Sequence, residues 1–181
     1  MAESSNIFLW IIKTCGKVIL KPSEFFDGLS GRKPEYRQAY AFSFLLTFVS
    51  VIAAVATDTF LAPSGVFATA IPEGLSLATI IGAMVASAVV VFFIAALLHG
   101  CLIVAGSSGS IKKTFLVTAY SSAAYIFFVV PFIGGTLSNI VWIILVITGL
   151  KKIHDISIVR AIAGVLAFMI IPVIIGMLFV K

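Results

Sequence analysis

Long apolar stretches alternate with short polar segments along most of this chain. A helix crosses the hydrocarbon core of a bilayer with roughly 20 mostly apolar residues, and several of these stretches approach or exceed that length. The pattern predicts five membrane-spanning helices, at residues 39–56, 76–105, 114–133, 136–150 and 158–180. We therefore expect an all-α integral membrane protein whose spans form a five-helix transmembrane bundle.

The segment before these spans has a different pattern, in which apolar and charged positions recur at helical spacing. Between residues 6 and 20, Ile11, Cys15 and Ile19 fall on one face of a helix, and Lys13 and Lys17 fall on the other. This segment is too short and too charged to cross a membrane. It is typical of an amphipathic helix that lies in the membrane plane with its lysines toward the lipid phosphates. The sequence thus predicts an interfacial and cytoplasmic N-terminal segment, residues 1–38, before a membrane domain, residues 39–181.

The apolar stretch from residue 114 to 150 is broken only by Pro131 and the pair Gly134 and Gly135. Two spans must share it if both are complete. The second, residues 136–150, would then be about 22 Å long at a rise of about 1.5 Å per residue, which is short of a core about 30 Å thick. Either this hairpin crosses fully and thins the membrane, or it turns back before the far side. We favour the full but shallow hairpin, and either form returns the chain to the same side.

Basic residues orient the predicted spans because cytoplasmic loops hold an excess of Lys and Arg. The segment from 58 to 75 has no basic residue and is expected outside, where its apolar residues would rest on the outer interface. Of the 12 basic residues, only Lys181 falls on the outer side of this arrangement. We expect a cytoplasmic N-terminus, an outside C-terminus and the other basic residues in three inner clusters: Lys13, Lys17, Lys21, Arg32, Lys33 and Arg37; Lys112 and Lys113; Lys151, Lys152 and Arg160.

Composition agrees with a lipid environment. The chain is 61% hydrophobic and 10% charged, whereas soluble domains contain about 25% charged residues. The net charge of +5 does not indicate nucleic-acid binding, since the basic residues flank apolar spans and do not alternate with aromatic residues along a stripe. Anionic lipid headgroups account for them better.

Candidate chemistry is sparse. The seven acidic residues all lie outside the predicted spans or at their ends, so no carboxylate pair could act as acid and base within the membrane. The HExxH, P-loop and CxxC motifs are absent. Ser121 and Ser122 are better explained as small helix-packing residues than as nucleophiles. We predict a non-enzymatic protein with no catalytic residue, no cofactor and no metal site.

Two polar residues within the spans are candidates for an intramembrane polar site. His99 is the one titratable residue inside a span, where polar groups are costly and often functional, although hydrogen bonding to a neighbouring helix is the alternative. Asn139 could join helices by a hydrogen bond. His154, beside Asp155, is predicted to be a solvated loop residue. Cys15 is interpreted as a small packing residue, with palmitoylation as the alternative.

Three stretches resemble a known family of membrane proteins: KPSEFFDGL at 21–29, LLHGCLIVAGSSGSIKKTF at 97–115, and VPFIGGTLSNIVWIILVITGLKKIHDISIVRA at 130–161. In this order they resemble the Ypt-interacting-protein (Yip) domain family. The resemblance implies a five-span membrane protein, and the eukaryotic members belong to the early secretory pathway and associate with Rab-type GTPases and with one another. The acidic Asp-Leu-Tyr-Gly-Pro-type signature of those members is missing here. The chain is therefore similar to prokaryotic members, and the resemblance does not carry GTPase binding over to it.

These features together predict association as the function, in membrane organisation or as a trafficking-like scaffold or adaptor at a prokaryotic plasma membrane. The expected partners are anionic lipids and a membrane protein or a second copy of the chain. Small residues at Ala83, Ala86, Ser87 and 119–124 are candidate faces for other membrane helices. The alternative is a small transporter or channel for a neutral solute or ion, with a water-lined cavity that reaches His99. The candidate lipid- or partner-binding residues are Lys13, Lys17, Lys112, Lys113, Lys151 and Lys152.

Overall fold

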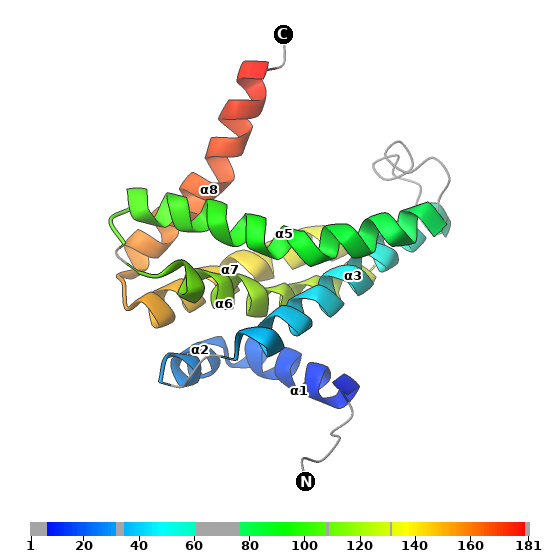
Figure 1. Ribbon diagram of the computed structural model, residues 1–181, viewed down its shortest axis with the longest axis horizontal. Coiled ribbons are helices and arrows are strands. Elements are labelled where there is room, and N and C mark those ends of the chain that lie inside the picture. Colours follow the sequence, from blue (N-terminus) through cyan, green and yellow to red (C-terminus); the bar gives the residue numbers. More distant parts are fainter. Residues whose placement is uncertain (1–6, 32–34, 61–76, 108, 131, 180–181) are drawn as a thin grey trace.

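The computed structural model describes residues 7–31, 35–60, 77–107, 109–130 and 132–179, and all regular secondary structure in these ranges is helical (Figure 1). The elements are α1 Ile7–Leu20, α2 Pro22–Ser30, α3 Tyr36–Phe60, α5 Leu77–Val104, α6 Ile111–Ser121, the 3₁₀ helix η1 Ser122–Val129, α7 Gly134–His154 and α8 Ile158–Phe179. The all-α prediction is confirmed. The predicted outer loop lies largely outside the described residues, as does the C-terminal Lys181.

The core lies between α3, α5, α7 and the continuous α6–η1 segment, which run side by side in Figure 1. Large apolar side chains from each of these helices are fully or almost fully buried, among them Phe42, Leu98, Val117 and Leu145. Many exposed side chains are also large and apolar, which is the pattern of a helix group whose outer surface meets lipid. Apolar residues therefore serve both as core and as outer surface.

The N-terminal helices form part of this core. The amide of Lys21 donates to the carbonyl of Lys17 at 3.0 Å, and Pro22 then begins α2. Proline is well tolerated in the first turn, where its missing N–H has no helical partner. Phe26 on α2 is fully buried, and α2 packs against α7. The phenyl ring of Phe42 on α3 meets the indole ring of Trp10 on α1 edge-on, with the two ring centroids 5.9 Å apart. This contact holds α1 beside α3.

The hairpin between the third and fourth predicted spans differs from a pair of simple α-helices. The α6 helix ends at Ser121, and the chain continues as η1 to Val129, so the stretch predicted as one α-helix changes its winding midway. The turn that follows places Phe132 at a φ of 65°, and a Cβ at Gly134 would overlap the carbonyl oxygen of Phe127. Glycine therefore permits the tight return into α7.

The α7 helix is longer than the predicted 136–150 span. It runs from Gly134 to His154, so Lys151 and Lys152 lie in its last turn and not in a loop. Its 21 residues correspond to about 31 Å at about 1.5 Å per residue. The helix ends at Asp155, whose φ of 53° is left-handed, a conformation that asparagine and aspartate adopt more readily than most residues.

The last helix departs from the predicted compact bundle. Ala161, Gly164 and Val165, in the first half of α8, are buried against α5 and α7. A Cβ at Gly164 would lie 2.6 Å from Leu102 Cδ2, so this glycine allows close approach to α5. The second half carries exposed residues such as Met169 and Ile174 and projects away from the other helices (Figure 1). Only the first half of α8 belongs to the bundle.

Among the residues that the structure describes, two helical segments are long and apolar enough to cross a membrane, Ile80–Val104 and Gly134–His154. A shorter apolar segment, Ile158–Ile171, lies in α8. These segments support a membrane protein. The further predicted crossings, including the fully crossing hairpin, stay predictions.

Candidate functional site

Two histidines that are far apart in the sequence meet across one threonine. His99 lies on α5, Thr114 in the first turn of α6, and His154 is the last residue of α7. The distance from Thr114 Oγ1 is 3.0 Å to His99 Nδ1 and 3.1 Å to His154 Nε2. The two imidazole centroids are 6.4 Å apart. We call these three residues the His–Thr–His cluster.

The cluster links three helices through a single hydroxyl group. A threonine hydroxyl has one proton, so it donates to one imidazole nitrogen and accepts from the N–H of the other. Thr114 is fully buried, which leaves the two histidines as partners in an enclosed position. Ser110 fixes the first turn of α6, since its Oγ accepts from the amide of Lys112 at 3.3 Å. The arrangement has the chemistry of an interhelical hydrogen-bond network and of a short proton relay.

The loop between α5 and α6 covers His154. A Cβ at Gly109 would overlap the imidazole at Nδ1, so glycine allows the loop backbone to lie directly on the ring. This Nδ1 atom has no hydrogen-bond partner among the described residues. With 8% of its surface exposed, His154 is buried, and its prediction as a solvated loop residue is wrong.

The periodicity of α7 explains the burial of His154 and could have revealed it. Val146, Leu150 and His154 follow one another at intervals of four residues, and all three are buried. Residues four apart share one face of a helix. The pair Lys151 and Lys152 suggests a loop only if the helix is assumed to stop before them, whereas helical spacing continues through them to His154.

The histidine at position 99 is half-buried and lies within an apolar helix, as expected. Asn139, the other candidate for an intramembrane polar site, is exposed on α7, and the described residues give its side chain no hydrogen-bond partner. The structure therefore brings His99 together with a threonine and a second histidine, and it does not bring Asn139 to this site.

Four of the candidate lysines lie at the same end of the helix group as the cluster. Lys112 and Lys113 lie in the first turn of α6, next to Thr114, while Lys151 and Lys152 precede His154 at the end of α7. Because Thr114 contacts His154, the two pairs are close in space. We call this region the cationic end, defined by Lys112, Lys113, Lys151 and Lys152.

The N-terminal helices reach the cationic end through an ion pair. Lys152 Nζ is 3.2 Å from Asp27 Oδ1 on α2, with the two side chains 33% and 64% exposed. Pairs this exposed contribute little to stability, but this one positions α2 beside the end of α7. Lys17 lies in the last turn of α1, and its carbonyl accepts the hydrogen bond from the Lys21 amide just before α2 begins. Lys13 lies one helical turn further from α2, and both lysines are exposed.

The small residues predicted to face other membrane helices are mostly used inside the chain. Ala83 and Ser87 on α5 are buried, and so is every residue from Ala119 to Ala124. Ser87 Oγ donates to the carbonyl of Ala83 at 2.6 Å, so its hydroxyl is satisfied within its own helix. Of this set only Ala86 is exposed. These positions allow close packing within the fold and do not form a free association face.

Both cysteines are enclosed by the fold. Cys15 and Cys101 are both buried and unbonded to each other. Within the described ranges, no group of three or more His, Cys, Asp and Glu residues is arranged to hold a metal ion.

Comparisons with known proteins agree with the helical pattern. A family model described as the Yip1 domain matches residues 16–180 of the chain, which is most of its length. No curated protein matches the chain. No solved structure matches it either.

Proposed function

Since the chain belongs to the Yip1 domain family, a membrane protein family linked to trafficking, we propose that it is a non-enzymatic scaffold that organises membrane lipids and a protein partner. In this proposal five helical segments lie in the membrane, and the cationic end faces the cytoplasm. The partner is a second membrane protein or another copy of the chain. GTPase binding is not part of the proposal, because the acidic signature of the eukaryotic members is absent.

The gathering of exposed lysines at one end of the fold carries this proposal. Lys112, Lys113 and Lys151 are exposed, and Lys152 is half-buried beside Asp27. Near the surface of a membrane that contains anionic lipids, each basic residue contributes about 1 kcal/mol of attraction. Four lysines that the fold holds together can therefore recruit anionic lipids more strongly than any of them alone.

Extraction of the protein together with its surrounding lipid tests the proposal. Membranes that express the protein are dissolved with a styrene–maleic acid copolymer, and the lipids in the purified discs are measured by mass spectrometry. We expect the discs to be enriched in anionic lipids relative to the whole membrane. The triple variant Lys113→Gln, Lys151→Gln and Lys152→Gln should reduce this enrichment.

The matched control replaces the same three lysines with arginine, which keeps the charge and should keep the enrichment. Crosslinking within the discs reports whether a second copy or another membrane protein is present. Equal lipid composition in the wild type and the glutamine variant, together with unchanged crosslinking, would refute the proposed role. A flux of neutral solute or ions through vesicles that is lost in His99→Ala would favour the transporter alternative.

A further inference from the structure

An apolar groove that Arg37 and Lys112 help to line lies between the beginning of α3, the middle of α5 and the beginning of α6. Its volume is about 440 Å³, which falls within the range of small-molecule sites. Aromatic rings from all three helices line it, and Arg37 and Lys112 complete the wall. We call it the aromatic groove and define it by Tyr36, Arg37, Tyr40, Phe92, Lys112 and Phe115.

The rings of the aromatic groove form a continuous series. The ring centroid of Phe92 is 5.3 Å from that of Tyr40 and 5.1 Å from that of Phe115. The ring centroid of Tyr36 is in turn 6.5 Å from that of Phe115. The hydroxyl of Tyr40 donates to the carbonyl of Ala88 at 3.1 Å, so its polar end is already satisfied. Phe92 keeps 52% of its surface exposed. The rings therefore offer an apolar surface that suits a hydrocarbon chain.

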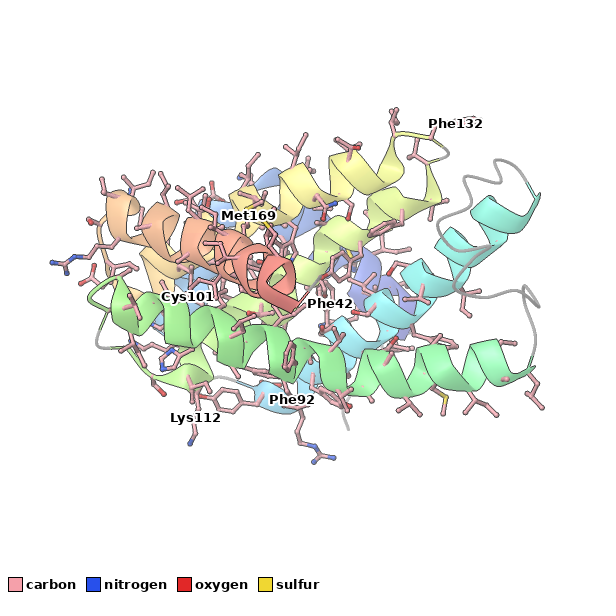
Figure 2. The ribbon with its side chains drawn as sticks, turned by 90° about the horizontal axis from the view of Figure 1, so that it is seen from above. Phe42, Phe92, Cys101, Lys112, Phe132 and Met169 are labelled. Carbon is pink, nitrogen blue, oxygen red and sulfur yellow. The ribbon has the colours of Figure 1, made fainter. Side chains whose placement is uncertain are left out.

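The two cations stand on different helices at one groove. Arg37 lies in the first turn of α3, and Lys112 lies in the first turn of α6. Figure 2 shows Lys112 and Phe92 along the same edge of the molecule. The ion pairs found in the described part of the chain are Lys21 with Glu24 and Lys152 with Asp27, so neither involves Arg37 or Lys112. A guanidinium and an ammonium group together suit a phosphate.

We propose that the aromatic groove binds one anionic glycerophospholipid, with its phosphate between Arg37 and Lys112 and an acyl chain along Phe92 and Phe115. A lining that combines aromatic rings with two basic residues matches the two chemical parts of such a lipid. This inference rests on the membrane placement in the proposed function, and it adds a specific site to the general attraction of the cationic end.

A second, larger groove lacks the basic residues of the aromatic groove and serves as a comparison for its proposed selectivity for an anionic lipid. It lies between α1, α3 and η1, has a volume of about 780 Å³ and is lined by apolar residues such as Ile11, Leu46 and Phe127. None of the described residues that line it is charged. It offers hydrocarbon contact but nothing to fix a phosphate, so it does not distinguish one lipid from another.

Native mass spectrometry of the detergent-purified protein tests the proposal with phosphatidylglycerol as the probe and phosphatidylcholine as the neutral comparison. We expect one phosphatidylglycerol per chain to bind at least about tenfold more tightly than phosphatidylcholine. The double variant Arg37→Gln with Lys112→Gln should weaken phosphatidylglycerol binding by roughly 30-fold, as expected for two cations near an anionic group.

The control Lys21→Gln with Arg160→Gln removes the same charge at exposed positions that do not line the groove, and it should leave this binding unchanged. Phe92→Ala should weaken it, while Phe93→Ala should not, because Phe93 is exposed on α5 but does not line the groove. Size-exclusion profiles verify that each variant is folded. Equal loss in the two double variants, or equal binding of the two lipids, would overturn the proposal.

The two lipid experiments separate this site from the proposed function. The scaffold experiment leaves Arg37 and Lys112 unchanged, and the groove experiment leaves Lys113, Lys151 and Lys152 unchanged. If the glutamine triple variant keeps both its lipid enrichment and its crosslinking but the groove variant loses its bound lipid, the scaffold role fails and the groove stands. The reverse pair of results would reject the groove alone.

Discussion

The hydroxyl of Thr114 holds the His–Thr–His cluster together, because its oxygen is within hydrogen-bond distance of both histidines, whose ring centroids are 6.4 Å apart. Sequence reasoning identified His99 from its place in an apolar span. It could not identify Thr114 as its partner, since threonine is common in membrane helices and its contacts depend on how α5, α6 and α7 pack. Helical spacing in α7 does predict a buried His154, provided that the helix is extended past its two lysines.

Replacing Thr114 with valine should destabilise the protein by about 1–3 kcal/mol. Valine keeps the size of the side chain but leaves His99 Nδ1 and His154 Nε2 without the oxygen they share, and an unpaired buried polar group carries a cost of this order. Thermal unfolding in detergent measures the loss. The control is Thr148→Val, whose hydroxyl donates to the carbonyl of Ile144 at an exposed position. Equal unfolding temperatures for the two variants would contradict the role of the cluster.

The thiol of Cys15 should react slowly. Burial raises the pKa of Cys15 to about 11, so at pH 7.5 the reactive thiolate is scarce, and its share grows only as the pH rises toward that value. In a Cys101→Ala background, we expect N-ethylmaleimide to modify Cys15 at least about tenfold more slowly than a cysteine placed at Lys17 in a Cys15→Ala chain. Similar rates at the two positions would show that Cys15 is not enclosed as described.

At the scale of elements, hydropathy located the helices well but not their faces. The predicted spans at 76–105 and 158–180 closely match α5 and α8. In a membrane helix the lipid-facing and core-facing sides are both apolar, so periodicity does not reveal which side packs. For this reason the sequence predicts an outer face for Ala83 and Ser87, whereas both are buried. The change to the 3₁₀ helix η1 and the departure of α8 depend on tertiary packing, which an apolar pattern does not encode.

The close contact between the α5–α6 loop and α7 can be tested by substituting the loop glycine. Gly109→Ala should lower stability by about 1–3 kcal/mol, a usual cost of overpacking, because the added methyl group would overlap the imidazole of His154. Thermal unfolding again provides the measurement. Gly100→Ala is the matched control, since a Cβ there meets no atom within 4 Å, and alanine is favoured over glycine within a helix. If Gly109→Ala unfolds no earlier than Gly100→Ala, the loop does not lie against His154.

At the scale of the whole molecule, the cationic end unites segments that are separate in the sequence. The sequence predicts that the three basic clusters all lie on the cytoplasmic side of the membrane. The structure brings Lys112 and Lys113 close to Lys151 and Lys152. The aromatic groove was not predicted. Tyr36, Phe92 and Phe115 lie far apart in the sequence, and only the packing of α3, α5 and α6 places their rings in one series.

The side of the membrane that the cationic end faces is the central claim, and site-directed cysteine labelling measures it most directly. Single cysteines are placed at Lys112, Lys151 and Ser64 in a background that carries Cys15→Ala and Cys101→Ala. Ser64 belongs to the predicted outer loop, outside the described residues. A membrane-impermeant maleimide is then applied to intact cells and to inverted membrane vesicles.

We predict that the cysteine at position 64 reacts in intact cells, and that those at positions 112 and 151 react only in inverted vesicles. Positive charge is retained on the cytoplasmic side of a membrane, which gives this result its physical basis. Reaction at position 112 or 151 from the same side as position 64 would contradict the account.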